Sequence, residues 1–286
     1  MTKFYCIVTD VENLANPDTF RLLKAAVEEK GLDFEVIDVK TQSRTITSIE
    51  PGILYRLGIT NDAVMLEARL VNDSMVTFYK NKDNLFARGF EWGSTLRLQM
   101  AGLPIIPTVF AIAKLDKPTL QVAVDELGGF PIVVKGAGGS HGSAVKSANS
   151  VDEISEIIAN DDNKKTLVLR RFIHEARHIR IVVVGDQAVD AIEYQPQPDD
   201  FRTNAVAVPQ VKAFDLESNL GIKQTAEAAV KTIGLEFGGV DILLQPDGQF
   251  FIAEVNFPCN FARNQMNTGT NVAGAMVEYL VKKSEG

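Results

Sequence analysis

Apolar residues recur along this chain at two spacings, which predict helices alternating with short strands. An apolar run over residues 4–8 is followed by Asn16-Pro17, a typical helix start, and then by apolar residues at helical spacing up to Gly31. A second apolar run covers residues 34–39. We expect these segments to form a parallel β-α-β unit, which is right-handed in nearly all proteins.

Glycine and proline mark where the pattern divides into domains. Weaker strand candidates in the first third of the chain cover residues 53–54, 63–66 and 75–79. A helix over residues 92–100 ends at Gly102, and Pro104 and Pro107 follow it. The predicted domains are an amino-terminal α/β domain at residues 1–85, a linker helix with a central lobe at 86–170, and a carboxy-terminal lobe at 171–286. The first has either a supporting or a substrate-binding role.

The stretch FGGVDILLQPDGQFFIAEVNFPCN, residues 237–260, predicts two apolar strands joined by a turn at Asp247-Gly248. A two-residue turn places Asp241 opposite Glu254, with Asn256 on the same face one pleat further along. Facing carboxylates repel each other, and partial burial strengthens the repulsion. A Mg²⁺ ion would remove the conflict, because it binds carboxylate and amide oxygens. The alternative is an acid pair at a frayed strand end, separated by solvent.

A glycine-rich loop follows an apolar strand in PIVVKGAGGSHGSAV, residues 131–145. Glycine lets backbone N–H groups approach phosphate oxygens closely, and Lys135 adds a positive charge at the strand end. The loop is neither a Walker A motif nor a dinucleotide fingerprint, because a return strand follows it instead of a helix. Both a phosphate cover and a plain hairpin fit the pattern. The candidate cofactor-binding residues of this loop are Gly138, Gly139, Ser140 and Gly142.

Arginine, which suits bidentate contacts with phosphate or carboxylate, is frequent in the second half of the chain. Arg170 and Arg171 lie in an apolar strand, and Arg180 lies near the start of a second predicted hairpin. In the polar segment DDFRTNAVAV, Arg202 and Asn204 share a face if the backbone is extended. Taken singly, each loop arginine also fits a solvated side chain.

Composition narrows the classes of partner. The chain has 286 residues, 45% hydrophobic and 23% charged, and a formal net charge of -8. This charge argues against general binding to nucleic acid or to an anionic membrane, both of which favour basic surfaces. Cys6 and Cys259 are too few for a disulfide framework, and the amino-terminal apolar run is too short for a signal peptide or membrane span. We therefore expect a soluble, cytoplasmic protein.

The order of these elements resembles the ATP-grasp superfamily, and most closely its RimK-type and glutathione-synthetase-like branch. The matching stretches, strongest between residues 100 and 280, are VVKGAGGSHGSAV, HIRIVVVGDQAVDAIE, DFRTNAV, VDILLQPDGQFFIAEVNFP and TGTNVAGAMVEYL. The resemblance implies an α/β (α+β) ATP-grasp fold, in which an open amino-terminal α/β lobe precedes two α+β lobes that clasp the nucleotide.

The resemblance also implies roles for individual residues. Lys135 would contact the ATP phosphates below the glycine loop, while Arg171 and Phe172 would lie at the adenine hinge. Arg202 and Asn204 would lie beside the transferring phosphoryl group, and Arg180 would steady the carboxylate substrate or acyl phosphate. The implied Mg²⁺ ligands are Asp241, Glu254 and Asn256.

The implied activity is an ATP-dependent carboxylate–amine ligation. ATP phosphorylates a carboxylate, and an amine then attacks the acyl phosphate to give an amide. Positioning and charge neutralisation serve such phosphoryl transfer better than a covalent nucleophile does. The cofactors would be ATP and Mg²⁺, with Mn²⁺ as a substitute. The acceptor would be an amino acid or the carboxyl terminus of a peptide or protein. Dimers and tetramers in related families favour a homo-oligomer.

Several positions depart from the family pattern. Arg170-Arg171-Phe172 stands where a Gln-Glu-aromatic triplet is usual, His178 replaces an acidic residue, and an upstream lysine falls near Glu91. Small residues usually follow the metal-binding Asn, but here the sequence is Phe257-Pro258-Cys259-Asn260. These changes leave open a catalytically altered homologue that binds nucleotide or a peptide partner without ligation. We expect the histidines to lie mostly on the surface or in loops, and Cys259 to be a passive core residue.

Overall fold

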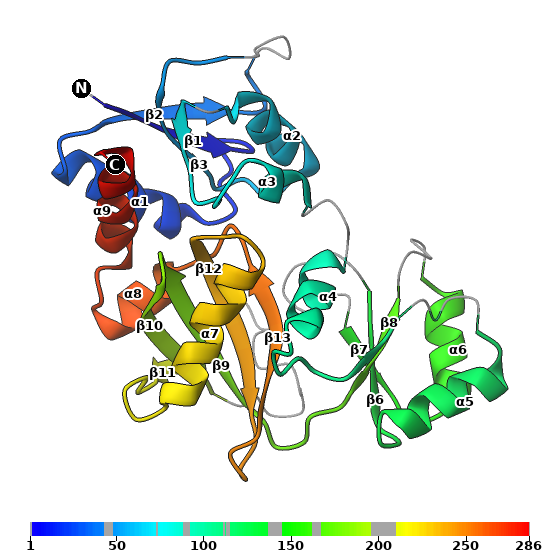
Figure 1. The fold of residues 1–286 in the computed structure, drawn as a ribbon. Coiled ribbons are helices and arrows are strands. Elements are labelled where there is room, and N and C mark those ends of the chain that lie inside the picture. The colour runs from blue at the N-terminus through cyan, green and yellow to red at the C-terminus, as the bar shows by residue number, and fades with distance from the viewer. Residues whose placement is uncertain are drawn as a thin grey trace.

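The computed structural model describes residues 2–42, 48–72, 74–87, 92–110, 112, 115–136, 145–161, 167–195 and 210–285. Within these residues the chain forms three sheets flanked by helices (Figure 1). The amino-terminal and carboxy-terminal sheets lie one above the other, and the central sheet lies to one side of them. This arrangement is the α+β architecture predicted from the sequence.

The amino-terminal sheet has the strand order β2-β1-β3-β4, and its described pairs are parallel. Its elements are β1 Lys3–Val8, α1 Pro17–Glu29, β2 Asp33–Asp38, β3 Gly52–Arg56, α2 Asn61–Leu70, β4 Met75–Val76 and α3 Asp83–Ala87. The predicted parallel β-α-β unit is confirmed. The strand predicted at residues 63–66 is wrong, because these residues lie in α2, where the Thr60 side chain caps the first turn by accepting from the Ala63 N–H at 3.4 Å.

The central sheet has the order β5-β8-β6-β7 and antiparallel pairing. Its elements, with the preceding helix, are α4 Gly93–Met100, β5 Thr108–Val109, α5 Lys117–Glu126, β6 Ile132–Lys135, β7 Val145–Ala148, α6 Val151–Ala159 and β8 Val168–Arg171. Ser150 caps α6, since its hydroxyl accepts from the Glu153 N–H at 3.2 Å. Helices α5 and α6 pack on one face of this sheet (Figure 1).

The carboxy-terminal sheet has the order β11-β10-β9-β12-β13, with antiparallel pairing throughout. Its elements are β9 Arg177–Val184, β10 Gln187–Tyr194, β11 Val211–Ala213, α7 Leu220–Thr232, β12 Phe237–Leu244, β13 Phe250–Asn256, α8 Ala262–Thr268 and α9 Val272–Glu285. In Figure 1, α7 covers one face of this sheet. The strands β9, β12 and β13 therefore form the framework that carries the predicted metal residues.

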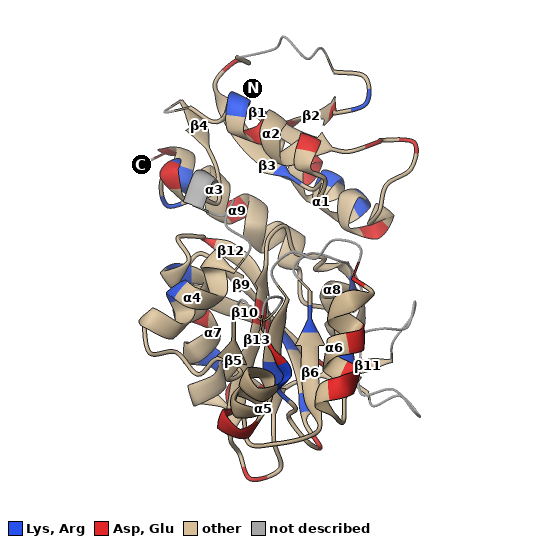
Figure 2. Cartoon of the chain, turned by 90° about the vertical axis from the view of Figure 1, so that its right-hand side faces the viewer, with Lys and Arg blue, Asp and Glu red and all other residues tan. Residues whose placement is uncertain are grey.

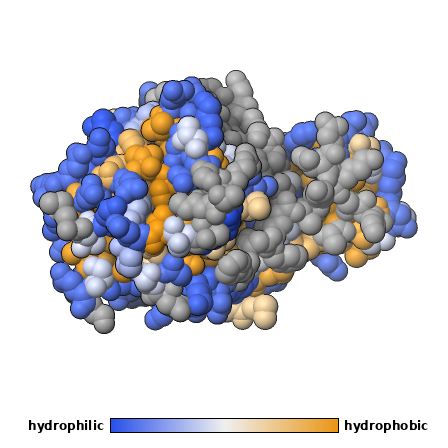
Figure 3. All heavy atoms as spheres, turned by 90° about the horizontal axis from the view of Figure 1, so that it is seen from above, coloured by the Kyte–Doolittle hydropathy of each residue, from blue (hydrophilic) through white to orange (hydrophobic). Residues whose placement is uncertain are grey.

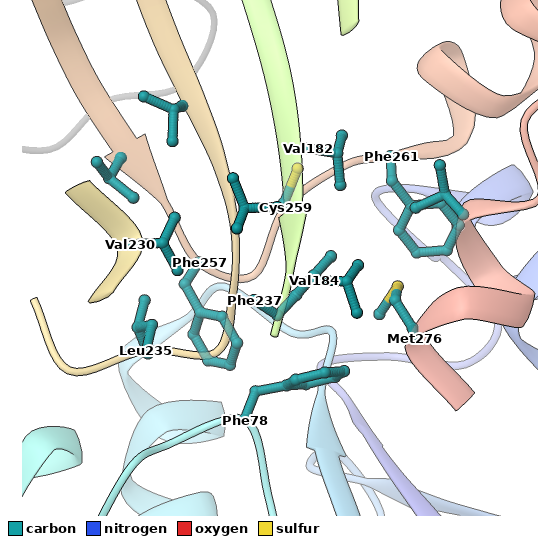
Figure 4. Close-up of a cluster of buried hydrophobic side chains, with 14 of the residues drawn as sticks. Phe78, Val182, Val184, Val230, Leu235, Phe237, Phe257, Cys259, Phe261 and Met276 are labelled. Carbon is teal, nitrogen blue, oxygen red and sulfur yellow. The ribbon is translucent and has the colours of Figure 1, made fainter. Parts of the chain in front are cut away.

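One hydrophobic core joins the amino-terminal and carboxy-terminal sheets. Phe78 lies 4.9 Å from Phe237 between ring centroids, with Phe257 beside them (Figure 4). Phe78 also stacks on Tyr279 at 6.1 Å, and Tyr55 meets Phe257 edge-on at 6.0 Å. The central sheet has a separate core beneath α5 and α6. The predicted three-domain division stays a prediction, but the structure indicates that the first and third segments pack as one body.

The β12–β13 hairpin differs from its predicted turn. The Gly248 N–H donates to the Gln245 carbonyl at 3.0 Å, and the Gln245 N–H to Gln249 at 2.8 Å, so the loop has three residues instead of two. Gly248 has φ +88°, which suits glycine at this position of a three-residue hairpin loop. The pairing register then shifts between Asp241 and Ile242, which restores Asp241 opposite Glu254. The predicted partner of Asp241 is confirmed, although the predicted turn is wrong.

In the view of Figure 3, hydrophobic residues form a band across the larger lobe, bordered by hydrophilic side chains, and smaller hydrophobic patches are visible on the other lobe. Among the helices of the described segments, none combines the length and the apolar composition needed to cross a membrane.

Candidate active site

Asp241, on β12, is held by an arginine from the neighbouring strand. Arg180, on β9, is its direct partner in the sheet register and donates from Nε to Oδ1 and from Nη2 to Oδ2, both at 2.6 Å. The Asp241 side chain is 2% exposed and that of Arg180 is 12% exposed. His178 lies two residues before Arg180, with Nε2 at 3.1 Å from Asp241 Oδ1. Asp241 is thus a buried carboxylate with a bidentate counter-charge.

Glu254, on β13, connects the carboxy-terminal sheet to the central sheet. Lys135, at the end of β6, donates to Glu254 Oε2 at 2.8 Å. The Asn256 Nδ2 group lies between the two carboxylates, at 3.0 Å from Asp241 Oδ2 and 3.1 Å from Glu254 Oε1. In the view of Figure 2, the one acidic position of β13 lies beside basic residues of the central sheet. The structure therefore brings together Lys135, Arg180 and the three predicted metal residues.

The neighbouring cations keep both carboxylates ionised. Burial acts to raise the pKa of Asp241, but the Arg180 guanidinium and the His178 contact outweigh it, so this pKa lies well below its ordinary value of 3.8. Burial also acts to raise the pKa of Glu254, and the Lys135 ammonium outweighs it, so that this pKa too is lowered. Two ionised carboxylates that share one amide group form a suitable start for a cation site.

The lowered pKa of Asp241 predicts how stability depends on pH. The unfolded carboxyl titrates at about 4, so the stabilising contribution of Asp241 is present above that pH and is lost as the pH falls towards the lower pKa of the folded state. In EDTA, we expect the free energy of unfolding of Asp241→Asn to fall less between about pH 5 and pH 3 than that of the native chain. Urea titrations at each pH measure it.

Asp190 gives a control of opposite sign. Burial raises its pKa despite hydrogen bonds from Thr268 and Thr270, so it contributes stability below its unfolded pKa that is lost as the pH rises. Asp190→Asn should therefore steepen the loss of stability on acidification. Equal slopes for Asp241→Asn and the native chain would contradict the assignment of the Asp241 shift.

Arg170 is a further cation beside this cluster. It lies on β8, is 5% exposed, and donates from Nη1 to the Ala253 carbonyl on β13 at 2.9 Å. Its guanidinium lies 5.3 Å from the centre of the Trp92 ring, and Lys135 Nζ lies 6.0 Å from the same ring. Burial lowers the pKa of Arg170 to about 10, which still leaves it charged at neutral pH. Arg170 thus faces the same space as Lys135.

The structure does not bring the Arg171 side chain to this cluster. Successive residues of a strand point to opposite faces, and Arg171 Nε donates to the Leu127 carbonyl at the end of α5, at 2.9 Å. The expected contact of Arg171 with a nucleotide at the adenine hinge stays a prediction. Phe172 follows β8 directly and packs on His174, with ring centroids 4.8 Å apart. Any nucleotide contact of Phe172 stays a prediction.

Six other predicted site residues lie outside the described residues, and their roles stay predictions. They are Gly138, Gly139, Ser140, Gly142, Arg202 and Asn204. Gly136, the first residue of the glycine-rich loop, is described and buried directly after Lys135.

The sequence interpretation missed several neighbours of Asp241. His178 is not in a loop: it lies in β9, is 6% exposed, and packs on Tyr194 at 4.6 Å between ring centroids. Its position two residues before Arg180, on the same face of a strand, was the signal for this placement. Arg263, from α8, lies 6.0 Å from the centre of the Tyr194 ring. Cys259 is buried as expected, and burial raises its pKa to about 11, so it is not a thiolate nucleophile at neutral pH.

The loop after β13 links the site to the amino-terminal lobe. Asn260 donates to Asn16 at 2.7 Å and accepts from the Thr19 hydroxyl at 2.7 Å, so it connects to the first turn of α1. Phe257 packs against Tyr79 with ring centroids 5.2 Å apart. The loop that directly follows β13 is therefore fixed to the amino-terminal lobe.

Three comparisons bear on this arrangement. The chain matches the RimK-like ATP-grasp domain family over residues 94–280. It is 30% identical to a probable alpha-L-glutamate ligase of Pseudomonas fluorescens, over 92% of this chain and 91% of that protein. D-cycloserine synthetase DcsG has a similar fold, with a TM-score of 0.76 and 16% identity over 98% of this chain and 99% of the other.

The ATP-grasp ligase PsnB, in complex with a minimal precursor, Mg and ADP, also has this fold. Its TM-score is 0.71, with 14% identity over 99% of each chain. The two solved structures extend the likeness of fold to almost the whole length of the chain.

Proposed function

Because this chain belongs to the RimK-like ATP-grasp family and is an ATP-dependent carbon–nitrogen ligase, we propose that it joins a carboxylate to an amine through an acyl phosphate. In this reaction a carboxylate oxygen attacks the γ-phosphorus of ATP, and ADP leaves with the electron pair of the broken bond. The amine nitrogen then attacks the acyl carbon, phosphate leaves, and the nitrogen gives a proton to solvent. The observation that carries the proposal is the Asp241–Glu254 pair with Lys135 at its edge.

The donor set fits a magnesium ion. The side-chain oxygens of Asp241 and Glu254 lie within hydrogen-bond distance of one amide group of Asn256, so all three point at a common space. Rotating that amide by half a turn presents its oxygen there, and an all-oxygen set is what Mg²⁺ prefers. Bound Mg²⁺ would neutralise phosphate charge during the transfer.

The basic residues have separate roles in this proposal. Lys135 binds a phosphate oxygen of ATP in exchange for Glu254 Oε2, which is then free for the ion. Arg180 donates from Nε and Nη2 to Asp241, so it orients this proposed metal ligand. The remaining guanidinium nitrogen, Nη1, would face the acyl phosphate. Arg202, Asn204 and the glycine-rich loop keep their predicted roles beside the transferring phosphoryl group.

We place the acceptor among amino acids and peptides. The name of the Pseudomonas relative supports glutamate as the amino acid, and the complex of PsnB with a precursor peptide supports a peptide substrate. Similar folds serve different substrates, so the acceptor class is tested by experiment.

Incubation with Mg-ATP and a panel of amino acids and glutamate-ending peptides tests the proposal. We expect release of ADP and phosphate that depends on one acceptor class, together with a new amide product detected by mass spectrometry. Omission of the acceptor and replacement of Mg²⁺ by EDTA are the controls. Tight nucleotide binding without acceptor-dependent phosphate release would instead identify a relative that binds without ligating.

A further inference from the structure

The position of Glu254 depends on an irregularity in β13. Between the turn and Ile242 the pairing of β12 with β13 is regular, and Ile242 pairs with Ile252. If this register continued, Asp241 would lie opposite Ala253. In that register Glu254 would lie on the other face of the sheet, because neighbouring residues of a strand point to opposite faces. The shift at Ala253 is a β-bulge, and it alone brings Glu254 opposite Asp241. The pair at the centre of the site therefore exists only while this bulge is held.

A residue from another sheet holds the bulge. On the turn side of the bulge, the outer edge of β13 pairs with the backbone of residues 104–106. The Ile252 N–H donates to the Pro104 carbonyl at 2.7 Å, and the Ile106 N–H donates to the Ile252 carbonyl at 3.3 Å. At the bulge this backbone pairing gives way to the Arg170 guanidinium, which donates to the Ala253 carbonyl at 2.9 Å. A bulge leaves ladder groups without a strand partner, and leaving such a carbonyl unpaired would be costly.

A neutral hydrogen-bond donor could bind the Ala253 carbonyl, and burying it would cost less free energy than burying the charged Arg170 side chain. Arg170 is 5% exposed, and its Nε is buried without a hydrogen-bond partner in the part of the chain that the structure describes. Among the described residues, the charge that offsets its burial is that of Glu254, the residue directly after the bulge. Burying a guanidinium on these terms is unfavourable for stability alone. The positive charge of Arg170 therefore attracts the Glu254 carboxylate, while its hydrogen bond to the Ala253 carbonyl stabilises the bulge.

We propose that Arg170 is a positioning residue of the ligase reaction, which fixes the β-bulge at Ala253 and so keeps Glu254 in the metal-binding register. Because Arg170 belongs to β8 of the central sheet, the register of β13 is set by contact between two sheets. The metal residues are thus completed only when the central and carboxy-terminal sheets are docked. This inference rests on the proposed function, since it concerns the same Asp241–Glu254 pair.

Arg170→Met, with Arg171→Met as the matched control, tests the proposal. Both substitutions remove an arginine of β8 that donates to one backbone carbonyl, but the carbonyl of Leu127 lies away from the site. Electron paramagnetic resonance measures Mn²⁺ affinity in the absence of nucleotide, so that the predicted adenine contact of Arg171 does not enter. We expect Arg170→Met to weaken it about tenfold, as for other groups that orient metal ligands, and Arg171→Met to leave it unchanged. Removal of a positive charge alone would strengthen cation binding, so weakening identifies a loss of position.

Two further measurements separate positioning from general stability. Hydrogen exchange of the β13 amides, in the absence of metal, should be faster in Arg170→Met than in Arg171→Met at equal melting temperature. Arg170→Lys, which keeps a charged donor, should recover part of the Mn²⁺ affinity. Native Mn²⁺ affinity in Arg170→Met, or equal β13 exchange in both variants, would overturn the inference. A native chain that binds no Mn²⁺, with or without ADP, would refute the proposed function instead, while the metal-free exchange would still test the bulge.

Discussion

Asp241→Asn is expected to abolish acceptor-dependent ADP release and to destabilise the metal-free protein. The substitution removes a proposed metal ligand, and loss of one electrostatic stabiliser of a transition state costs about a hundredfold or more in rate. It also leaves the Arg180 guanidinium, 12% exposed, without its bidentate partner. Breaking a buried ion pair on one side costs about 3–5 kcal/mol of unfolding free energy. Urea unfolding in EDTA and coupled detection of ADP measure the two effects.

Glu254→Gln is the matched variant that separates these effects. The Glu254 side chain is 40% exposed and its partner Lys135 is 19% exposed, so solvent screens their pairing. We expect the same loss of ADP release, with a change in unfolding free energy below about 1 kcal/mol. Equal destabilisation by both variants, or full activity of either, would contradict the roles assigned to the pair.

Lys135→Met should change nucleotide and metal binding in opposite directions. Loss of a hydrogen bond to a charged phosphate, worth roughly 1.5–3 kcal/mol, should weaken binding of a non-hydrolysable ATP analogue by about tenfold to a hundredfold. Mn²⁺ without nucleotide should bind more tightly than in the native chain, because Lys135 no longer occupies Glu254 Oε2. Calorimetry with the analogue and paramagnetic resonance with Mn²⁺ alone measure the two affinities.

Lys146→Met is the control for this experiment. Lys146 is an exposed residue of β7 and pairs with Val134, the residue that precedes Lys135 in β6. Because neighbouring residues of a strand point to opposite faces, Lys146 faces away from the site. Both affinities should match those of the native chain. If Lys135→Met weakened both ligands alike, Lys135 would act by holding the local structure and not by exchanging partners.

The arrangement of the strands could be predicted because the apolar pattern of each is determined by burial on one or both faces. The run at residues 4–8 and the parallel partner at residues 34–39 are examples. The segment at residues 63–66 was misassigned, because its apolar residues are also compatible with one face of a short helix. There the decisive signal was the side-chain cap of Thr60, which apolar periodicity does not report.

The pairing of Asp241 with Glu254 was predicted correctly from a turn that does not exist. The loop has one residue more than the Asp247-Gly248 turn, and the bulge at Ala253 compensates for it. Sequence periodicity shows neither feature, because a bulge is fixed by contacts from outside the strand. Here that contact comes from Arg170, on a different sheet.

Contacts between distant segments could not be predicted in detail. The sequence suggested that Lys135 and Glu254 serve one ligand, but not that they bond directly to each other. It also left Arg170 and Arg171 nearly equivalent, although alternation along β8 sends one to the site and the other to the Leu127 carbonyl. The face of a strand that points toward the site is determined by how whole sheets pack against each other. The local pattern of apolar and polar residues contains little of that information.

The core shared by the first and third sheets has a consequence for the order in which the chain folds. Tyr55 and Phe78 complete their packing against Phe237, Phe257 and Tyr279, which are synthesised much later. Contacts between such distant residues form slowly, because the loop between them must close first. On the ribosome, the amino-terminal strands therefore cannot complete their packing until β12, β13 and α9 have been synthesised. The central lobe, whose core extends from Ile112 to Leu169, can fold before them.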